Sequence, residues 1–493
     1  MQEEKSSYRQ IMKATSLFGG VQVFTIIISI IRSKFVAVLL GPAGMGIVGL
    51  LQSTLGLVAS ITNFGLRTSA VKDIAAAVGT NNLTRVALVV TVMRRLVWIT
   101  GLLGAFITAV FSSWLSQITF GNTDYTFAFI WLSVTLLFNQ LSSGQSVVLQ
   151  GFRKLKLLAK SSVIGSFIGL LVTVPLYYFY DERGIVPVII ISSLTTLLLT
   201  WYFSRKVAID KVEVDIAQTI KEGKQMLILG FMISLSGLLT VAFSYIVRIY
   251  INSTGGLADV GLYGAGFAII STYVGLIFSA MATDYYPRLS GVATNVKKRT
   301  LLINQQAEIA ILIIAPILIG FLIFIKWVVI LLYSTKFIAI NAMIYWAAMG
   351  MFFKAVSWAM AFLFLAKGSS KLFFWNELIV NIYMLGFNLL GYYLWGLTGL
   401  GISFMVSYVL YLLQVYIITK IKYKFSFTIN FIKIFLVQFI LAILAFITIH
   451  FISEFNSYII GVLLIVISSW YSFKELDRRL HLKEILLKIR KRN

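Results

Sequence analysis

Residues 14 to 40 read ATSLFGGVQVFTIIISIIRSKFVAVLL, a run in which Arg32 and Lys34 are the only charged side chains. A helix needs about 20 apolar residues to cross the hydrocarbon core of a bilayer, so this run is long enough to span a membrane. Similar runs recur at about residues 46 to 66, 96 to 118, 125 to 149, 161 to 180, 185 to 204, 225 to 251, 261 to 283, 301 to 325, 341 to 366, 372 to 394, 398 to 419, 431 to 453 and 457 to 473. The sequence therefore predicts an all-α polytopic membrane protein with about fourteen transmembrane helices.

The composition of the 493 residues leaves no room for a large soluble domain. Hydrophobic residues make up 59% and charged residues 12%. There is no Cys, and the two His, His450 and His481, are far apart in the sequence. From this composition we expect no metal site and no cofactor. The outer connections are short and carry no Ser/His/Asp set or paired carboxylates, so we expect no enzymatic activity.

The basic residues set the orientation of the spans. With the N-terminus placed in the cytoplasm, 35 of the 42 Lys and Arg residues fall in inner segments. Three fall outside, and four lie within spans. This bias follows the positive-inside rule, so we expect both termini to be cytoplasmic.

The chain contains an internal repeat. Arg32 matches Arg248 at an offset of 216, and Gly46 matches Gly261 at 215. T-N-N-L-T-R at 80 to 85 matches T-N-V-K-K-R at 294 to 299 at 214, and G-F-R-K-L at 151 to 155 matches G-S-S-K-L at 368 to 372 at 217. Six spans separate the copies, so both enter from the same side. We expect two parallel six-helix lobes around a central cavity: an N-terminal lobe at 1 to 215, a C-terminal lobe at 216 to 425, two further helices at 426 to 473, and a basic cytoplasmic tail at 474 to 493.

Four bases within the spans are candidate substrate-binding residues: Arg32, Lys34, Arg248 and Lys354. A buried base in hydrocarbon costs about 2.5 to 3.5 kcal/mol on insertion scales, so it normally faces a partner or a wet cavity. Arg32 and Arg248 occupy matching positions of the repeat, and two guanidinium groups suit a diphosphate. The alternative is that each reaches the interface or binds a carbonyl in its own lobe.

Charged residues near span ends form a second set of candidates. Arg67 and Arg288 are candidates for an entry ring, with ordinary inner-face bases as the alternative. Asp284 lies four residues before Arg288, which predicts a local pair unless Pro287 breaks the helix. Together with Asp284, Glu308 and Glu377 are the candidate ion-coupling residues, and structural ion pairs are the alternative for all three.

The sequence resembles the Wzx-type lipid-linked oligosaccharide flippases, also called O-antigen translocases, of the superfamily that contains MATE exporters and MurJ. The likeness rests on K-A-T-S-L-F-G-G at 13 to 20, R-S-K-F-V-A-V-L-L-G-P-A-G-M-G at 32 to 46 and T-D-Y-Y-P-R-L-S at 283 to 290. Family bases at the end of the first span correspond to Arg32 and Lys34. Many relatives have twelve spans, so residues 431 to 473 depart from that plan.

The resemblance implies an alternating-access flippase that moves an undecaprenyl-diphosphate-linked oligosaccharide, such as an O-antigen or capsule repeat unit, to the outer leaflet of a bacterial inner membrane. The implied partners are that glycan, membrane lipids, H+ or Na+ for coupling, and a polysaccharide polymerase with its chain-length regulator, but no nucleic acid. A MATE-like cation-coupled drug exporter is the alternative function. That function predicts acids rather than bases facing the cavity.

Overall fold

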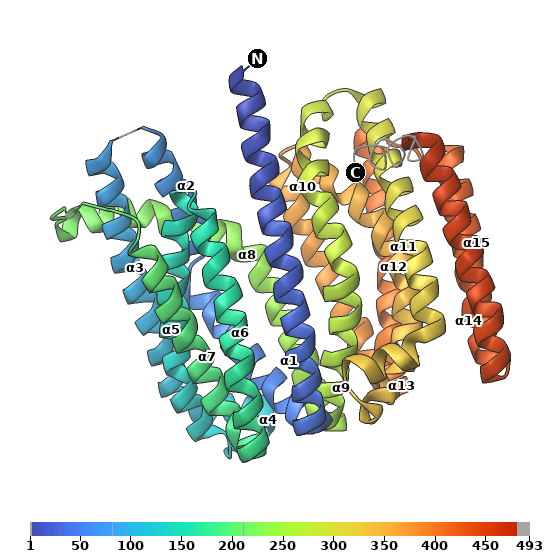
Figure 1. Ribbon diagram of the computed structural model, residues 1–493, viewed down its shortest axis with the longest axis horizontal. Coiled ribbons are helices and arrows are strands. Elements are labelled where there is room, and N and C mark those ends of the chain that lie inside the picture. The colour runs from blue at the N-terminus through green and yellow to red at the C-terminus, as the bar shows by residue number, and fades with distance from the viewer. Residues whose placement is uncertain (1, 81, 211, 481–493) are drawn as a thin grey trace, which may run out of the picture. The chain divides into compact units, whose positions relative to one another are not determined.

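The computed structural model describes residues 2–80, 82–210 and 212–480, and all regular structure in these ranges is helical (Figure 1). The first half of the chain forms α1 (Gln2–Thr62), α2 (Leu66–Gly79), α3 (Leu83–Val110), α4 (Ser112–Phe120), α5 (Thr126–Gly151), α6 (Leu155–Tyr180), the short η1 (Asp181–Gly184), α7 (Ile185–Ser204) and α8 (Ile216–Gly255). The second half forms α9 (Leu257–Phe267), the π-helix η2 (Ala268–Val274), α10 (Gly275–Val292), α11 (Val296–Leu332), η3 (Thr335–Ile340), α12 (Asn341–Ala366), α13 (Ser370–Tyr423), α14 (Ile429–Phe451) and α15 (Glu454–Leu480).

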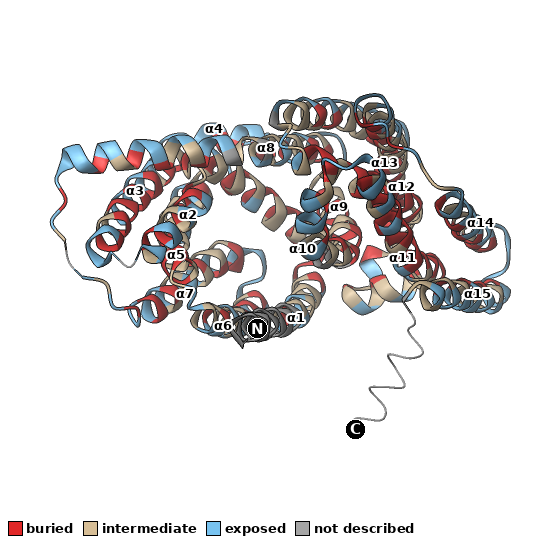
Figure 2. Cartoon of the chain, turned by 90° about the horizontal axis from the view of Figure 1, so that it is seen from above, coloured by how far each residue is buried: buried red, intermediate tan, exposed pale blue. Residues whose placement is uncertain are grey.

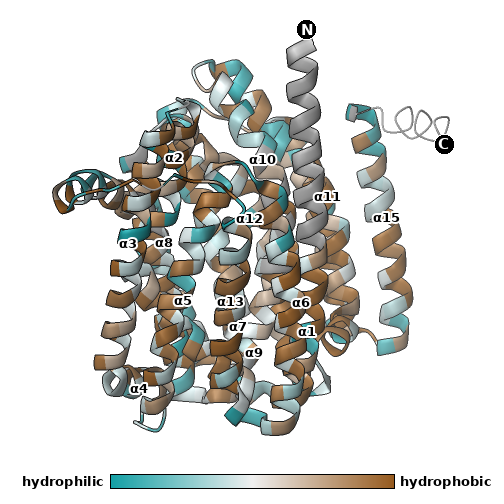
Figure 3. Ribbon diagram, turned by 60° about the vertical axis from the view of Figure 1, so that its left-hand side comes forward, coloured by the Kyte–Doolittle hydropathy of each residue, from teal (hydrophilic) through white to brown (hydrophobic). Residues whose placement is uncertain are grey.

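The prediction of about fourteen spans in an all-α fold is confirmed. Nine helical stretches of the described chain are long and apolar enough to cross a membrane. Three of these contain a break: α1 at Gly41, the stretch from α6 to α7 at η1, and α13 at Trp395 and Gly396. The bent α8 and the stretch from α9 to α10 correspond to the two remaining predicted spans. Hydrophobic residues cover most of α6 and α7 (Figure 3).

The chain divides into two compact units. The first is Met1–Gly261 with Leu332–Ser334, and the second is Leu262–Leu331 with Thr335–Asn493. The predicted lobes change at residue 215, whereas α8 belongs to the first unit, since it packs against α1, α2 and α3. The functional lobe boundaries stay a prediction.

α1 is broken at Gly41, and the segment after the break contacts α9 at the two glycines that the repeat pairs. Gly41 has φ +67° and ψ −170°, a conformation that favours glycine, and Pro42 then opens the returning half of the helix. A methyl group added at Gly46 would lie 1.9 Å from the Leu257 carbonyl oxygen, and one at Gly261 would lie 1.9 Å from the Pro42 carbonyl oxygen. The two glycines that the repeat pairs therefore form one close backbone contact.

The third span differs from its predicted limits. α3 begins at Leu83, thirteen residues before the predicted start at 96, because Asn82 caps it by accepting a 2.9 Å hydrogen bond from the Arg85 backbone N–H. The helix then ends at Val110, and α4 follows. Arg94 and Arg95, which the hydropathy pattern assigns to a connection, therefore lie on a helix.

Each unit has its own packed interior. In the first unit, α2, α3 and α5 enclose a cluster that includes Leu66, Ile74, Met93 and Val148, all nearly inaccessible to solvent. In the second unit, α12 packs along α13, and most of its side chains are buried. Figure 2 shows the buried residues on the inward faces of these helices.

Candidate functional site

Arg32 is half-buried within the first span, on the part of α1 that precedes the break at Gly41. Its Nη1 is 4.0 Å from the position that a Cβ at Gly169 of α6 would occupy. The buried Tyr177 of the same helix lies close enough to interact electrostatically with the guanidinium. Within the described part of the chain, this guanidinium forms no hydrogen bond or ion pair. Arg32 therefore brings a positive charge into the first unit that its neighbours do not neutralise.

Arg248 of α8 approaches the other half of α1. A methyl group at Gly49 would lie 3.0 Å from Arg248 Nη1, so the glycine leaves room for the guanidinium. Arg32 and Gly49 are nine and eight residues from Gly41, which corresponds to about 12 to 14 Å along each half of the helix. Arg32 and Arg248 thus lie at similar depths but face different neighbours. Lys34 is half-buried two residues beyond Arg32.

A polar cavity of about 340 Å³ opens within the first unit, among α1, α2, α3, α5 and α8. Arg67 is the one charged residue among those that line it in the described chain. The other polar lining residues are uncharged: Thr62, Asn63, Thr68, Thr100, Asn139, Gln140, Ser143 and Ser234. Hydroxyl and amide groups of this kind both donate and accept hydrogen bonds, as the hydroxyl groups of a sugar do.

The cavity depends on a polar stretch of α5 that the sequence reasoning missed. Residues 139 to 146 read NQLSSGQS, in the middle of the predicted span at 125 to 149. Gln145 accepts a 2.6 Å hydrogen bond from Ser204 of α7, which joins the two helices. Asn139, Gln140 and Ser143 line the cavity instead. So many polar residues within one span are a signal that a sequence search for charges does not detect.

Lys354 of α12 is half-buried in the second unit, among aromatic rings. Its Nζ lies 5.6 Å from the ring centre of Phe404 and 5.2 Å from that of Tyr408, both on α13. These are cation–π distances. Within the described residues the ammonium group forms no ion pair, and these two ring faces stabilise its charge.

The predicted local pair between Asp284 and Arg288 is confirmed. Arg288 Nη1 lies 3.0 Å from Asp284 Oδ2, and both side chains are exposed. α10 continues through Pro287, so the proline does not separate them. The entry role of Arg288 and the coupling role of Asp284 stay predictions.

The two other predicted coupling acids have partners within the second unit. Glu308 is buried on α11 and accepts a 2.9 Å hydrogen bond from Arg479 Nε of α15, and Arg479 also binds Glu475. This arrangement is the structural ion pair that the sequence left open. Glu377 accepts a 3.1 Å hydrogen bond from the Tyr411 hydroxyl. In the described chain Glu377 forms no ion pair.

The predicted basic tail at 474 to 493 begins as a helix. α15 extends to Leu480, beyond the predicted end of the last span at 473, and Arg479 within this extension binds Glu308. His481 and the rest of the tail lie outside the described residues.

A charged cluster joins α2, α3 and α8 in the first unit. Both Nη atoms of Arg85 bind the Glu222 carboxylate, at 2.7 and 2.8 Å. Asp73 and Lys72 line the same cavity, of about 350 Å³. Burial raises the pKa of Asp73 above its ordinary value; Lys72 and Arg85 oppose the shift, and Glu222 adds to it.

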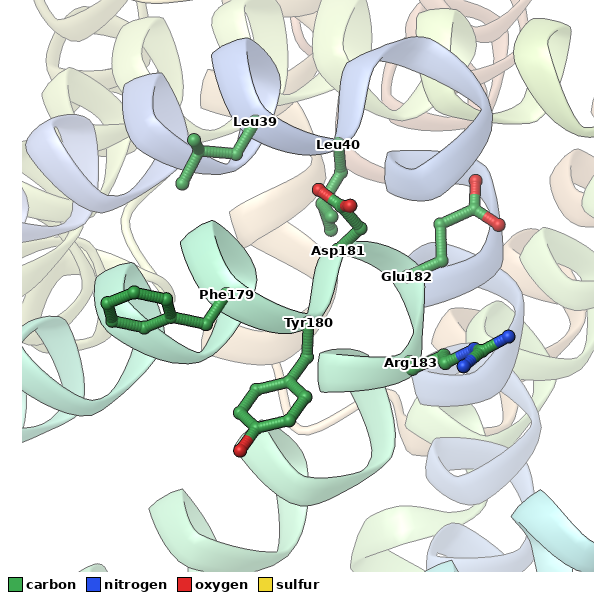
Figure 4. A pocket seen from close by; sticks show the side chains of 7 residues that line it. All are labelled: Leu39, Leu40, Phe179, Tyr180, Asp181, Glu182 and Arg183. Atoms are coloured by element: carbon green, nitrogen blue, oxygen red, sulfur yellow. The ribbon is translucent and has the colours of Figure 1, made fainter.

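A second charged pocket, of about 610 Å³, lies beside the turn between α6 and α7 (Figure 4). Leu39 and Leu40 of α1 line it together with Asp181, Glu182 and Arg183 of the turn. This pocket carries charges of both signs, whereas the charged residues inside the first unit's spans are bases.

The helices of the described chain define an all-helical, multi-pass membrane protein. Residues 11–292 match the family model described as polysaccharide biosynthesis protein, which is more than half of the chain. The chain therefore belongs to this family. A comparison with curated protein sequences gives no match.

Solved structures with the same fold include a multidrug resistance MATE family transporter in an inward-facing conformation, with a TM-score of 0.68, 17% identity, and coverage of 82% of this chain and 96% of that one. The lipid II flippase MurJ in an inward closed conformation gives a TM-score of 0.65 and 14% identity, over 94% of this chain and 99% of that one. A third structure is a MOP superfamily transporter from Pyrococcus furiosus, whose binding pocket is described as having reverse polarity. It gives a TM-score of 0.58 and 15% identity, over 83% of this chain and 96% of that one. At these identities the likeness concerns the fold.

Proposed function

We propose that the protein is a flippase that moves an undecaprenyl-diphosphate-linked oligosaccharide from the inner to the outer leaflet of a bacterial inner membrane by alternating access. The observation that carries the proposal is the set of bases within the first unit's spans, Arg32, Lys34 and Arg248, in a chain of the polysaccharide biosynthesis family. The fold it shares with a lipid II flippase supports a lipid-linked substrate.

The diphosphate is the part of such a substrate that needs a protein. An unpaired charge in hydrocarbon faces a cost of tens of kcal/mol in the idealised limit, so it requires a wet, cationic path. Guanidinium groups bind phosphate oxygens in a bidentate manner and keep their charge. Arg32 and Arg248 supply two such groups at similar depths.

The polar cavity supports a glycan rather than a drug as the cargo. Its residues from α5 offer amide and hydroxyl groups, and the one charged lining residue in the described chain is the base Arg67. A cation exporter would place acids there. The MATE-like alternative therefore has the fold in its favour, but this cavity has the opposite polarity.

The membrane potential can drive the outward step. A substrate with about two negative charges that crosses 100 mV, inside negative, gains about 4.6 kcal/mol. Coupling to H+ or Na+ would assist the return of the empty carrier. Glu308 and Asp284 already bind arginines, whereas Glu377 forms no ion pair among the described residues and accepts a hydrogen bond from Tyr411, so Glu377 is the strongest coupling candidate of the three.

The test replaces both arginines. Arg32→Ala with Arg248→Ala should trap the lipid-linked oligosaccharide in the inner leaflet, which extraction of lipid-linked intermediates and staining of surface polysaccharide would measure. Arg153→Ala with Lys160→Ala removes the same charge from exposed residues outside the cavity and is the matched control. Undiminished surface glycan in the Arg32 and Arg248 variant would rule out their binding role, and resistance to cationic dyes without any glycan defect would favour the drug exporter.

A further inference from the structure

The first part of α8 has the geometry of a helix at a membrane interface. Residues Ile216–Met232 are bent by 52° from Gly237–Gly255, and in Figure 1 this first part lies crosswise to α3. Asp215 caps its start, where its carboxylate accepts a 2.5 Å hydrogen bond from the Gln218 backbone N–H. Much of its outer side is exposed (Figure 2). A helix that lies across its spanning neighbours and exposes apolar residues is typical of the lipid headgroup region.

A groove of about 1020 Å³ runs between this part of α8 and α3. Its walls are largely apolar side chains that the protein leaves open. Trp98 and Ile99 of α3 are 50% and 59% exposed, and Ile216 and Ile220 of α8 are 77% and 63% exposed. Ile216 and Ile220 are four residues apart and so share one helix face. Trp98 is the residue type that marks the boundary between hydrocarbon and headgroups.

Two arginines of α3 lie at the groove. Arg95 Nη1 donates a 2.7 Å hydrogen bond to the Thr219 hydroxyl, which fixes this guanidinium against the start of α8. Arg94 is exposed and, within the described residues, forms no hydrogen bond or ion pair. Asp215 is the one acid among the described lining residues, and its carboxylate is engaged by the helix cap. The groove is therefore net positive beside its apolar walls.

We propose that this groove binds an anionic phospholipid of the bilayer. Arg94 and Arg95 would hold the headgroup phosphate, and an acyl chain would lie along Trp98, Ile216 and Ile220. A zwitterionic lipid carries its own compensating cation, so it gains less from two guanidinium groups. The site is separate from the polar cavity and from Arg32, and its occupant is a resident lipid rather than the cargo.

The test measures lipid retention by the purified full-length protein. Native mass spectrometry with equimolar phosphatidylglycerol and phosphatidylcholine should show preferential retention of phosphatidylglycerol. Each base near an anionic lipid contributes a factor of about five, so Arg94→Gln should lower that retention about fivefold. Ile216→Ser with Ile220→Ser should lower the retention of phosphatidylglycerol by shortening its apolar contact.

The matched control is Arg153→Gln, which removes one exposed arginine elsewhere in the first unit and should leave retention unchanged. Equal retention of both lipids by the unmodified protein would overturn the proposal, and so would an equal loss in Arg153→Gln and Arg94→Gln. Displacement of phosphatidylglycerol by undecaprenyl phosphate at equimolar concentration would also overturn it, because the groove would then belong to the cargo. None of these readouts depends on flippase activity.

Discussion

α5 and α12 occupy corresponding places in the internal repeat but differ in character. Both have 26 residues, and α12 begins 215 positions after α5, at 341 against 126. At that offset Asn139 corresponds to Lys354. α5 carries the polar stretch that lines a cavity, whereas α12 is mostly buried and carries Lys354 against aromatic rings. α5 therefore offers several neutral hydrogen-bonding groups, whereas α12 offers the single positive charge of Lys354.

The beginnings of α3 and α11 show the same kind of divergence. The repeat matches Arg85 with Arg299, and an Asn cap precedes each helix. Arg85 binds Glu222 near the surface. Arg299 is only 5% exposed and donates to the backbone carbonyls of Ala293 and Tyr423. Equivalent arginines of the repeat thus form a salt bridge in one unit and buried hydrogen bonds to backbone carbonyls in the other.

The largest effect on stability should come from Arg299. Arg299→Met leaves two buried carbonyls without their charged donor, which should lower the free energy of unfolding by about 3 kcal/mol. Arg85→Met removes a more exposed pair and should cost at most about 1 kcal/mol. Thermal unfolding of the purified variants would compare them. Equal losses would show that burial does not distinguish the two arginines.

Lys354→Asn, which copies the α5 residue into α12, should reduce glycan export about tenfold or more. The reason is that a charged hydrogen bond to a phosphate contributes about 1.5 to 3 kcal/mol. Surface polysaccharide in a strain that depends on this protein gives the readout. Lys371→Asn removes an exposed lysine and is the control. Normal export by the Lys354→Asn variant would show that the charge of Lys354 has no role in transport.

Asn139→Leu should have a smaller effect on export, about fivefold, because it removes neutral hydrogen bonds of about 1 kcal/mol. The same glycan assay applies, with Ser133→Ala on the same helix as the control, since Ser133 does not line the cavity. If Asn139→Leu reduced export more than Lys354→Asn does, the neutral groups of α5 would matter more to transport than the charge of Lys354 on α12.

The smallest effect concerns pH and the charged cluster of the first unit. The pKa of Asp73 is raised in the folded protein, so the folded state holds its proton at pH values where the unfolded chain has lost it. Stability should fall as the pH rises from the ordinary aspartate range through the raised pKa. Asp73→Asn should flatten this dependence, as unfolding midpoints between pH 4 and 7 would show. If the unfolding midpoint of Asp73→Asn depended on pH as it does in the unmodified protein, Asp73 would not be the cause of that dependence.

Much of the fold follows from the sequence, because the hydropathy of each span is a local property. The repeat even pairs Gly46 with Gly261, which the structure brings into backbone contact. The polar stretch of α5 was also visible in the sequence, although a search restricted to charged residues passes over it. The partner of Glu308 was not predictable, since Arg479 is 171 positions away and lies in the segment predicted to be a basic cytoplasmic tail.

The sequence by itself determined that this chain crosses a membrane about fourteen times, because apolar segments in lipid must satisfy their backbone hydrogen bonds as helices. It also singled out Arg32 and Arg248 as bases within spans, although it assigned Arg94 and Arg95 to a connection and the structure places them on α3. Only the tertiary structure decided which acids are already paired, which polar residues open onto a cavity, and that α8 packs with the first unit. Those outcomes depend on the direction in which each helix face points, and packing between distant segments fixes that direction.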